Sequence, residues 1–195
     1  MGERYLETTK KKAQELGIPL IFWDESGFSL STIRGTTWCE IGKPILLREC
    51  YSRQSQTGLG MITMTPKQQR LKFCFTMFEG AMNTEWMIFF LTMVHDYYGC
   101  KKVMIILDGL SSHIAAQDYF ERVHPDWFWF EYLPAYSPEL NPVEQCWQYR
   151  KNVAMVNFVP MCVEQLEKKA CEAVQAINND PKLLPAFFHH AKLAL

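Results

Sequence analysis

The chain lacks the features that mark secreted, membrane-spanning and disulfide-stapled proteins. Its 195 residues contain no apolar run near the ~18 residues that a membrane-spanning helix needs, and its first 17 residues are polar and charged, unlike a signal peptide. Its seven cysteines are odd in number, which does not suit a disulfide framework, and none has the CxxC spacing of a zinc site. These absences predict reduced, buried thiols in a cytoplasmic protein with no membrane partner.

An excess of positive charge is also missing. Twenty Lys and Arg against 21 Asp and Glu give a formal net charge of -1, whereas a DNA-binding domain is usually basic. There is no internal repeat, low-complexity tract or linker, and 48% hydrophobic and 21% charged residues are typical of a globular protein. We therefore expect an N-terminal helical stub over residues 1–17 and one folded domain over residues 18–195.

Short apolar strands alternate with helical segments along the chain. Residues 19–23 read as a buried strand followed by a DESG turn, and the fully apolar run of residues 103–107 reads as a central parallel strand. The order predicts an α/β domain with a mixed sheet. The other expected strands are 58–65, 71–79 and 127–136, and the expected helices are 3–16, 83–99, 111–124, 142–154, 162–177 and 181–194.

Two aspartates stand at the ends of separate buried strands, Asp24 and Asp108. Desolvating a carboxylate costs several kcal/mol unless it is compensated, and ligands of open α/β sheets gather at the carboxyl ends of strands. Either aspartate alone is better explained as a turn residue, but the two together favour a site. If the strands are neighbours, the carboxylates repel each other, and a divalent cation with oxygen ligands is the natural partner.

The stretch YSPELNPVEQCW, residues 136–147, contains two glutamates beside prolines. Asn141 and Pro142 have the positions of an N-cap and a first helical residue, which puts Glu144 third in the helix. Glu144 then either reaches back to the Asn141 amide as in a capping box or presents a fixed carboxylate at the edge of the buried helix face. Glu139 lies in the preceding turn and is held less firmly.

Three blocks of the sequence resemble one family. FWDESGFSL with RGTTWCEIGKP, then ILDGLSSH, and finally YLPAYSPELNPVEQCW are similar to the catalytic domain of DDE transposases, in the bacterial insertion-sequence branch of the Tc/mariner superfamily. The resemblance covers roughly residues 18–155. It implies that Glu144 is the third acid, because 35 residues separate it from Asp108, close to the family spacing, whereas Glu139 would leave 30.

The resemblance implies a fold and a mechanism. The fold is RNase H-like, with a mixed five-stranded sheet flanked by helices. Asp24, Asp108 and Glu144 would be both the catalytic residues and the ligands of two Mg2+ or Mn2+ ions, in an endonuclease and polynucleotidyl transferase that cleaves DNA and transfers strands at insertion-sequence ends. The implied partners are the element ends, target DNA and a second copy of the chain, in the bacterial cytoplasm at the nucleoid.

The sequence departs from the family pattern at two points. Gly109 stands where the family often has Asn, which removes a polar contact but no metal ligand. Family members also carry helix-turn-helix DNA-binding domains before the catalytic core, and here only about 17 residues precede the first expected strand. Such a module is then carried on a separate chain, lost or removed, which would also explain the low net charge.

Several other residues have two interpretations. His113 is either a solvent-facing residue at a helix start or a contact to the scissile phosphate, and Glu25 points to the opposite face of its strand from Asp24. Trp38 and Trp147 are expected to pack in the fold. Basic clusters are usually solvated surface, but some are candidate contacts to DNA phosphates, namely Lys67, Arg70, Lys72, Arg150 and Lys151.

Two rival functions stay open from the sequence. One is another RNase H-like nuclease, such as a resolvase or a nuclease of RNA–DNA hybrids. The other is a catalytically silent domain of a decayed or domesticated element that acts in interactions. The leading interpretation predicts that Asp108→Ala abolishes DNA cleavage and leaves thermal stability unchanged or raised, because a buried charge is removed.

Overall fold

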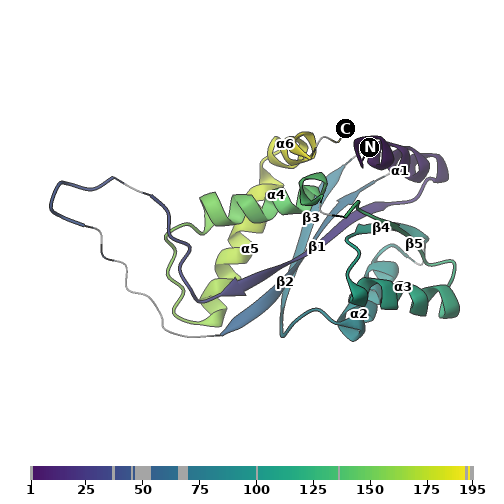
Figure 1. Ribbon diagram of the computed structural model, residues 1–195, viewed down its shortest axis with the longest axis horizontal. Coiled ribbons are helices and arrows are strands. Elements are labelled where there is room, and N and C mark those ends of the chain that lie inside the picture. Colours follow the sequence, from purple (N-terminus) through teal and green to yellow (C-terminus); the bar gives the residue numbers. More distant parts are fainter. Residues whose placement is uncertain are drawn as a thin grey trace.

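A five-stranded mixed sheet forms the centre of the fold (Figure 1). The computed structural model describes residues 2–36, 38–44, 46, 54–65, 70–99, 101–135, 137–191 and 193, with side chains from residue 6 onward. The strand order is β3-β2-β1-β4-β5, and β1 pairs antiparallel with β2 but parallel with β4. The strands are β1 (Leu20–Ser29), β2 (Ser55–Met64), β3 (Leu71–Glu79), β4 (Val103–Leu107) and β5 (Phe128–Tyr132). This confirms the expected sheet.

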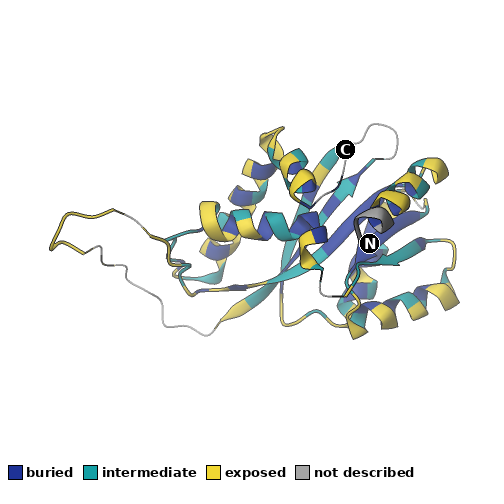
Figure 2. Cartoon of the chain, turned by 45° about the horizontal axis from the view of Figure 1, so that its top comes forward, coloured by how far each residue is buried: buried dark blue, intermediate teal, exposed yellow. Residues whose placement is uncertain are grey.

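Helices cover both faces of this sheet. Helices α2 and α3 enclose one apolar cluster with β4, while α1, α4, α5 and α6 enclose the other. Figure 2 shows the helices with buried residues on one side and exposed residues on the other. The helices are α1 (Gly2–Leu16), α2 (Thr84–Tyr97), α3 (Ser111–Val123), α4 (Pro142–Tyr149), α5 (Val163–Asn179) and α6 (Leu183–His190), with a 3-10 turn η1 (Pro138–Leu140) before α4 and a π-helix η2 (Arg150–Ala154) after it.

Local chemistry sets the helix ends at the predicted places. The Asn83 side chain accepts a hydrogen bond from the Trp86 amide at 2.8 Å and so caps α2. Gly17 ends α1 with a φ of 67°, which glycine adopts without a Cβ penalty. All five residues of β4 are buried, as expected for a central parallel strand.

Within the described residues, no helix combines the length and apolar character needed to cross a membrane.

Strand β1 does not end at Asp24, so the predicted DESG turn is wrong. The strand continues to Ser29 because β2 runs beside it over its whole length, with Asp24 opposite Gly60. Strand β4, in contrast, pairs only with the first three residues of β1. Asp24 therefore lies just beyond the point where the parallel pairing of β1 and β4 ends. The sequence could not show this, because the extra hydrogen bonds come from a strand about thirty residues further along the chain.

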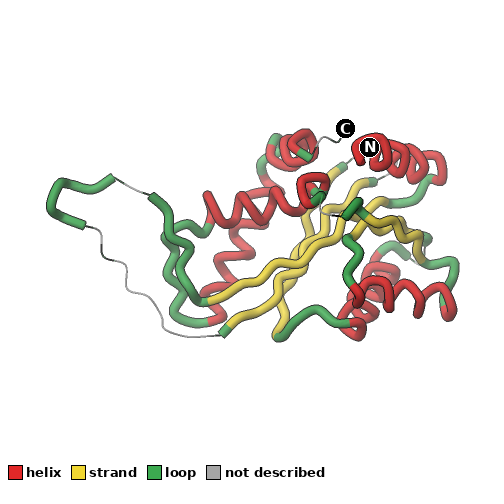
Figure 3. Tube along the Cα trace, viewed as in Figure 1, coloured by secondary structure: helices red, strands yellow, loops and turns green. Residues whose placement is uncertain are grey.

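The segment after β1 leaves the body of the molecule (Figure 3). Trp38 in this segment is 98% exposed, so the expectation that it packs in the fold is wrong. The base of the segment is tied to the residues after η2 by a parallel bridge between Ile33 and Val156. Trp147 is 3% exposed and packs against Phe28 and Phe73, as expected.

Candidate active site

The three predicted acids come from three different elements and line one cavity. Asp24 belongs to β1, Asp108 follows β4 directly, and Glu144 lies in the first turn of α4. The cavity has a volume of about 570 Å³ and is closed on one side by the loop from Leu133 to Asn141. Asp108 lies at the carboxyl edge of the sheet, where ligands of open α/β sheets gather.

Asn141 fixes the start of α4 over β1. Its side-chain oxygen accepts from the Val143 amide at 3.1 Å, and its side-chain nitrogen donates to the Trp23 carbonyl at 3.2 Å. The backbone amide of Asn141 donates to the Pro138 carbonyl at 3.0 Å. That amide therefore has an acceptor other than Glu144, and the capping-box alternative is not what the structure shows. The Glu144 side chain faces the cavity instead.

Glu139 lies outside this arrangement. It is exposed in the turn η1, and it is not among the residues that line the cavity. This agrees with the weaker hold expected for it. It also provides a nearby acid that can serve as a control for Glu144.

Burial and two neighbouring acids hold Asp24 in its neutral, protonated form. Burial raises its pKa to about 8, and the charges of Glu144 and Glu25 act in the same direction. The Trp147 indole Nε1 donates to Asp24 Oδ2 at 3.0 Å, which opposes the shift but does not cancel it. A site in which an acid is held neutral by neighbouring acids suits a cation.

Trp147 reaches Asp24 because the facing residue of β2 is a glycine. A Cβ added at Gly60 would lie 2.6 Å from the Trp147 ring, which is closer than van der Waals contact allows. Gly60 therefore leaves the space in which the indole lies against the sheet. Sequence reasoning assigned Trp147 to packing and missed this hydrogen bond. No local signal in the sequence marks this hydrogen bond, because it joins residues 123 positions apart.

Asp108 is held by His113, and His113 is held in turn by Glu25. The His113 Nδ1 lies 2.7 Å from Asp108 Oδ1, and its Nε2 lies 3.3 Å from Glu25 Oε1. The Trp23 indole also donates to Glu25 Oε1 at 2.7 Å. Glu25 thus points to the opposite face from Asp24, as expected.

The environment of His113 favours its charged form. Burial alone would lower the pKa of His113, but its hydrogen bonds with Asp108 and Glu25 outweigh that and raise it to about 10. Burial likewise acts to raise the pKa of Asp108, yet the hydrogen bond and charge of His113 leave it below its usual value. His113 is 1% exposed with both ring nitrogens engaged. The solvent-facing interpretation is therefore wrong, and the contact to the scissile phosphate stays a prediction.

The donor set fits a hard divalent cation by its chemistry, since Asp24, Asp108 and Glu144 supply only carboxylate oxygens. Their present geometry is incomplete. Among the described residues, no three His, Cys, Asp or Glu side chains lie close enough together to hold a metal ion. Asp108 is turned toward His113 and its side chain is 50% exposed, so it has room to rotate. Gly109 also lines the cavity, and a Cβ there would meet nothing within 4 Å.

The candidate DNA-contacting residues are not gathered at this cavity. Lys67 lies outside the described residues, and Arg70 and Lys72 lie at the start of β3, toward the end of the sheet where β1 begins. Lys151 is exposed on η2, whereas Arg150 is buried. Only the last two lie near the part of β1 that follows Asp24.

Comparisons with known proteins agree with this fold. The sequence profile of the DDE superfamily endonuclease family matches residues 19–167. The Mos1 transposase paired-end complex with the left transposon end matches with a TM-score of 0.64 at 17% identity, over 97% of this chain and 56% of that one. The Mos1 mariner paired-end complex with Mn matches with a TM-score of 0.64 at 18% identity, over 97% and 57%.

A third solved structure, the Mos1 strand transfer complex, matches with a TM-score of 0.60 at 18% identity and covers 98% of this chain and 59% of that one. The present chain therefore spans less than two thirds of the Mos1 polypeptides that it matches. No curated protein sequence matches it.

Proposed function

Since the chain belongs to the DDE superfamily of endonucleases, we propose that it is the catalytic domain of a transposase, which cuts DNA at the ends of a mobile element and joins those ends to target DNA. The observation that carries this proposal is that Asp24, Asp108 and Glu144 line one cavity. They lie 84 and 36 positions apart along the chain and come from β1, the end of β4 and the first turn of α4.

In this proposal the three acids hold two Mg2+ or Mn2+ ions, as the oxygen donor set suits. When bound, a metal pair activates the attacking oxygen and stabilises the leaving oxygen of an in-line displacement at phosphorus. The protein's own groups prepare this chemistry. Trp147 orients Asp24 through its indole hydrogen bond, Asn141 fixes the start of the helix that carries Glu144, and His113 holds Asp108 at the edge of the cavity.

The proposed substrate is DNA, and the solved relatives support this choice. The titles of the Mos1 structures describe a paired-end complex with a transposon end and a strand transfer complex. We extend this to element ends and target DNA for the present chain. A homodimer in the active complex and a helix-turn-helix module on a separate chain belong to the same proposal. A bacterial, nucleoid-associated location in the cytoplasm is also part of it.

The test compares DNA cleavage by the wild-type protein with cleavage by site variants and a matched control variant. Supercoiled plasmid is incubated with the 195-residue chain in Mg2+ or Mn2+ and scored for nicked and linear products. We expect Asp108→Asn and Glu144→Gln to lose at least 100-fold in rate, since each removes a proposed metal ligand (an effect of about the size seen for other essential site groups). Glu139→Gln, which changes an exposed glutamate next to the site, keeps the wild-type rate. Full activity in Glu144→Gln would overturn the site assignment.

Two other functions are distinguished by related measurements. Strong preference for an RNA–DNA hybrid over duplex DNA would favour another RNase H-like nuclease. A catalytically silent interaction domain predicts neither cleavage nor calorimetric binding of Mg2+ or Mn2+, even with DNA present. The complete set of three acids at one cavity favours the transposase over this last function.

A further inference from the structure

Arg150 is a buried cation without an acidic partner. It is 6% exposed, and among the described residues no Asp or Glu lies within ion-pair distance of it. One terminal nitrogen donates to the Gly27 carbonyl at 3.2 Å and the other to Ser26 Oγ at 3.2 Å, while the guanidinium lies 3.9 Å over the Phe28 ring. Its Nε is buried and has no hydrogen-bond partner. Arginines in such settings usually pair with a carboxylate or a phosphate.

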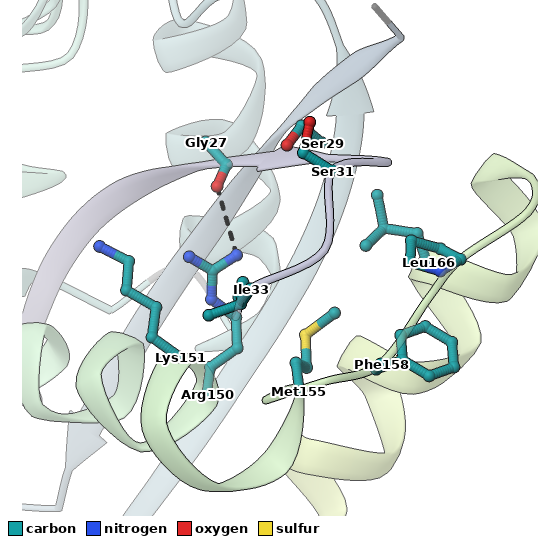
Figure 4. Close-up of a pocket in the computed structure, with 10 residues that line it drawn as sticks. Gly27, Ser29, Ser31, Ile33, Arg150, Lys151, Met155, Phe158 and Leu166 are labelled. Carbon is teal, nitrogen blue, oxygen red and sulfur yellow. Dashed lines mark hydrogen bonds between the residues drawn. The ribbon is translucent and has the colours of Figure 1, made fainter. Parts of the chain in front are cut away.

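Arg150 lines a second cavity, which we call the Arg150 cavity. It lies between the end of β1 and the residues from η2 onward, and its volume is about 210 Å³ (Figure 4). A water takes up about 30 Å³ of liquid, so the space admits a phosphate group. Its lining consists of Gly27, Ser29, Ser31, Ile33, Arg150, Lys151, Met155, Phe158, Pro160 and Leu166.

The polar lining of the Arg150 cavity offers hydrogen-bond donors and no carboxylate. Lys151, Ser29 and Ser31 are all exposed, so their polar groups can reach a ligand that enters from solvent. Thr32, between two lining residues, has a buried hydroxyl with no hydrogen-bond partner. Burial lowers the pKa of Arg150 to about 10, so the side chain is still charged at neutral pH. Such a set of groups suits an anion.

The backbone at Arg150 is unusual as well. A π-helix begins there, in which the Met155 amide donates to the Arg150 carbonyl at 2.9 Å. π-helical turns are rare and occur frequently at functional sites. This turn starts the segment that carries Arg150, Lys151 and Met155 along the wall of the cavity.

Two elements connect the Arg150 cavity to the three acids over short distances. Gly27 follows Asp24 by three residues on β1, a distance of ~10 Å at strand rise. Arg150 follows Glu144 by six residues along α4 into η2, a distance of ~9 Å at helix rise. A DNA strand with one phosphate at the acids and running along this seam would place a nearby phosphate of the same strand at the cavity.

We propose that the Arg150 cavity binds one backbone phosphate of the DNA substrate, an inference that rests on the proposed function. Arg150 supplies the buried charge and Lys151 the exposed one. The hydroxyls of Ser29 and Ser31 donate at the rim. Since phosphate contacts position the duplex but carry no sequence information, this contact sets the register of the strand relative to the three acids.

The test measures DNA binding by fluorescence anisotropy in EDTA, so that no strand is cut. Wild type is compared with Lys151→Gln, with Ser31→Ala, and with Lys101→Gln as the matched control. Lys101 is an exposed lysine before β4, at the opposite end of that strand from Asp108. None of these three substitutions touches the hydrogen bonds of Arg150, so folding is preserved, which equal melting temperatures verify.

We expect Lys151→Gln to weaken binding about eightfold at 0.1 M salt and to reduce the slope of log K against log salt by about 0.9, the effect of one lost phosphate contact. Lys101→Gln leaves both values unchanged. A scan of duplexes, each with one neutral methylphosphonate, adds the position. At the contacted phosphate, the methylphosphonate weakens DNA binding by wild type by a similar factor. It does not weaken binding by Lys151→Gln further, because that variant has already lost the same contact.

Normal DNA binding and cleavage by wild type, together with unchanged affinity and salt slope in Lys151→Gln and Ser31→Ala, would overturn this inference alone. Arg150 would then be a clamp between η2 and β1 and nothing more. Wild-type protein that binds no duplex at all would overturn both this inference and the proposed function.

Discussion

Asp24 is predicted to destabilise the metal-free protein, and replacing it with Asn removes that effect. The folded protein holds the pKa of Asp24 at about 8 against an ordinary value of 3.8, because the group is buried beside two other acids. Between these two values the folded state binds a proton that the unfolded state has released, so stability falls as pH rises through this window. Each pH unit above 3.8 lowers the free energy of unfolding by about 1.36 kcal/mol. The loss at pH 7 is then about 4 kcal/mol.

The measured effect will be smaller, because water entry and side-chain movement relax a buried charge. We expect Asp24→Asn to gain about 1 to 2 kcal/mol at pH 7, which is about 3 to 6 °C in melting temperature for a chain of this size. The amide oxygen of Asn still accepts the hydrogen bond from the Trp147 indole. The substitution is nearly isosteric, so it creates no cavity.

The assay is thermal unfolding of wild type and Asp24→Asn in EDTA between pH 4.5 and 8. The difference between the two melting temperatures should be small at pH 4.5 and grow as pH rises. His113 must be separated from this effect. Its raised pKa stabilises the fold fully below about 6.5 and less and less as pH rises toward 10, but it is present in both proteins and cancels in the difference. A variant that is less stable than wild type at pH 7 would refute the reasoning.

Two further substitutions have predicted signs. Asp108→Asn should lower the melting temperature of the metal-free protein by about 2 to 4 °C, because it removes the partner of the charged His113; a rise would instead support the expectation from burial alone. Gly60→Ala should cost about 1 to 3 kcal/mol and slow DNA cleavage, because the added Cβ displaces the Trp147 ring that orients Asp24. Gly109→Ala is its control, since a Cβ at that position meets nothing, and equal losses in both variants would contradict this role for Gly60.

The sequence predicted the elements and the three acids because both leave local signals. Apolar periodicity marks strands and helices, and caps such as Asn83 and Asn141 mark helix starts. An acid at the end of an apolar run is visible without knowing which strands pair. The resemblance of three blocks then favoured Glu144 over Glu139 as the third acid, and Glu144 lines the cavity whereas Glu139 does not.

Contacts between distant parts of the chain were not predictable in the same way. Glu25 and His113 are 88 positions apart and meet only because α3 covers β4 next to β1. The hydrogen bond from Trp147 to Asp24 spans 123 positions and depends on the register that puts Gly60 opposite Asp24. No single-residue pattern encodes such a register, because it is set by the pairing of β1 with β2.

The arrangement of the acids leads to one expectation about metal binding. The acids line one cavity while Asp108 is turned toward His113. Divalent ions should therefore bind with a change at Asp108, and binding should depend on Glu144 but not on the exposed Glu139.

Calorimetric titration of the metal-free protein with Mn2+ tests the central claim most directly, with Glu144→Gln and Glu139→Gln titrated beside wild type. We expect wild type and Glu139→Gln to bind Mn2+ alike, and Glu144→Gln to bind it at least 10-fold more weakly, which is a loss of about 1.4 kcal/mol or more. Equal affinity for Mn2+ in Glu144→Gln and wild type would contradict this claim.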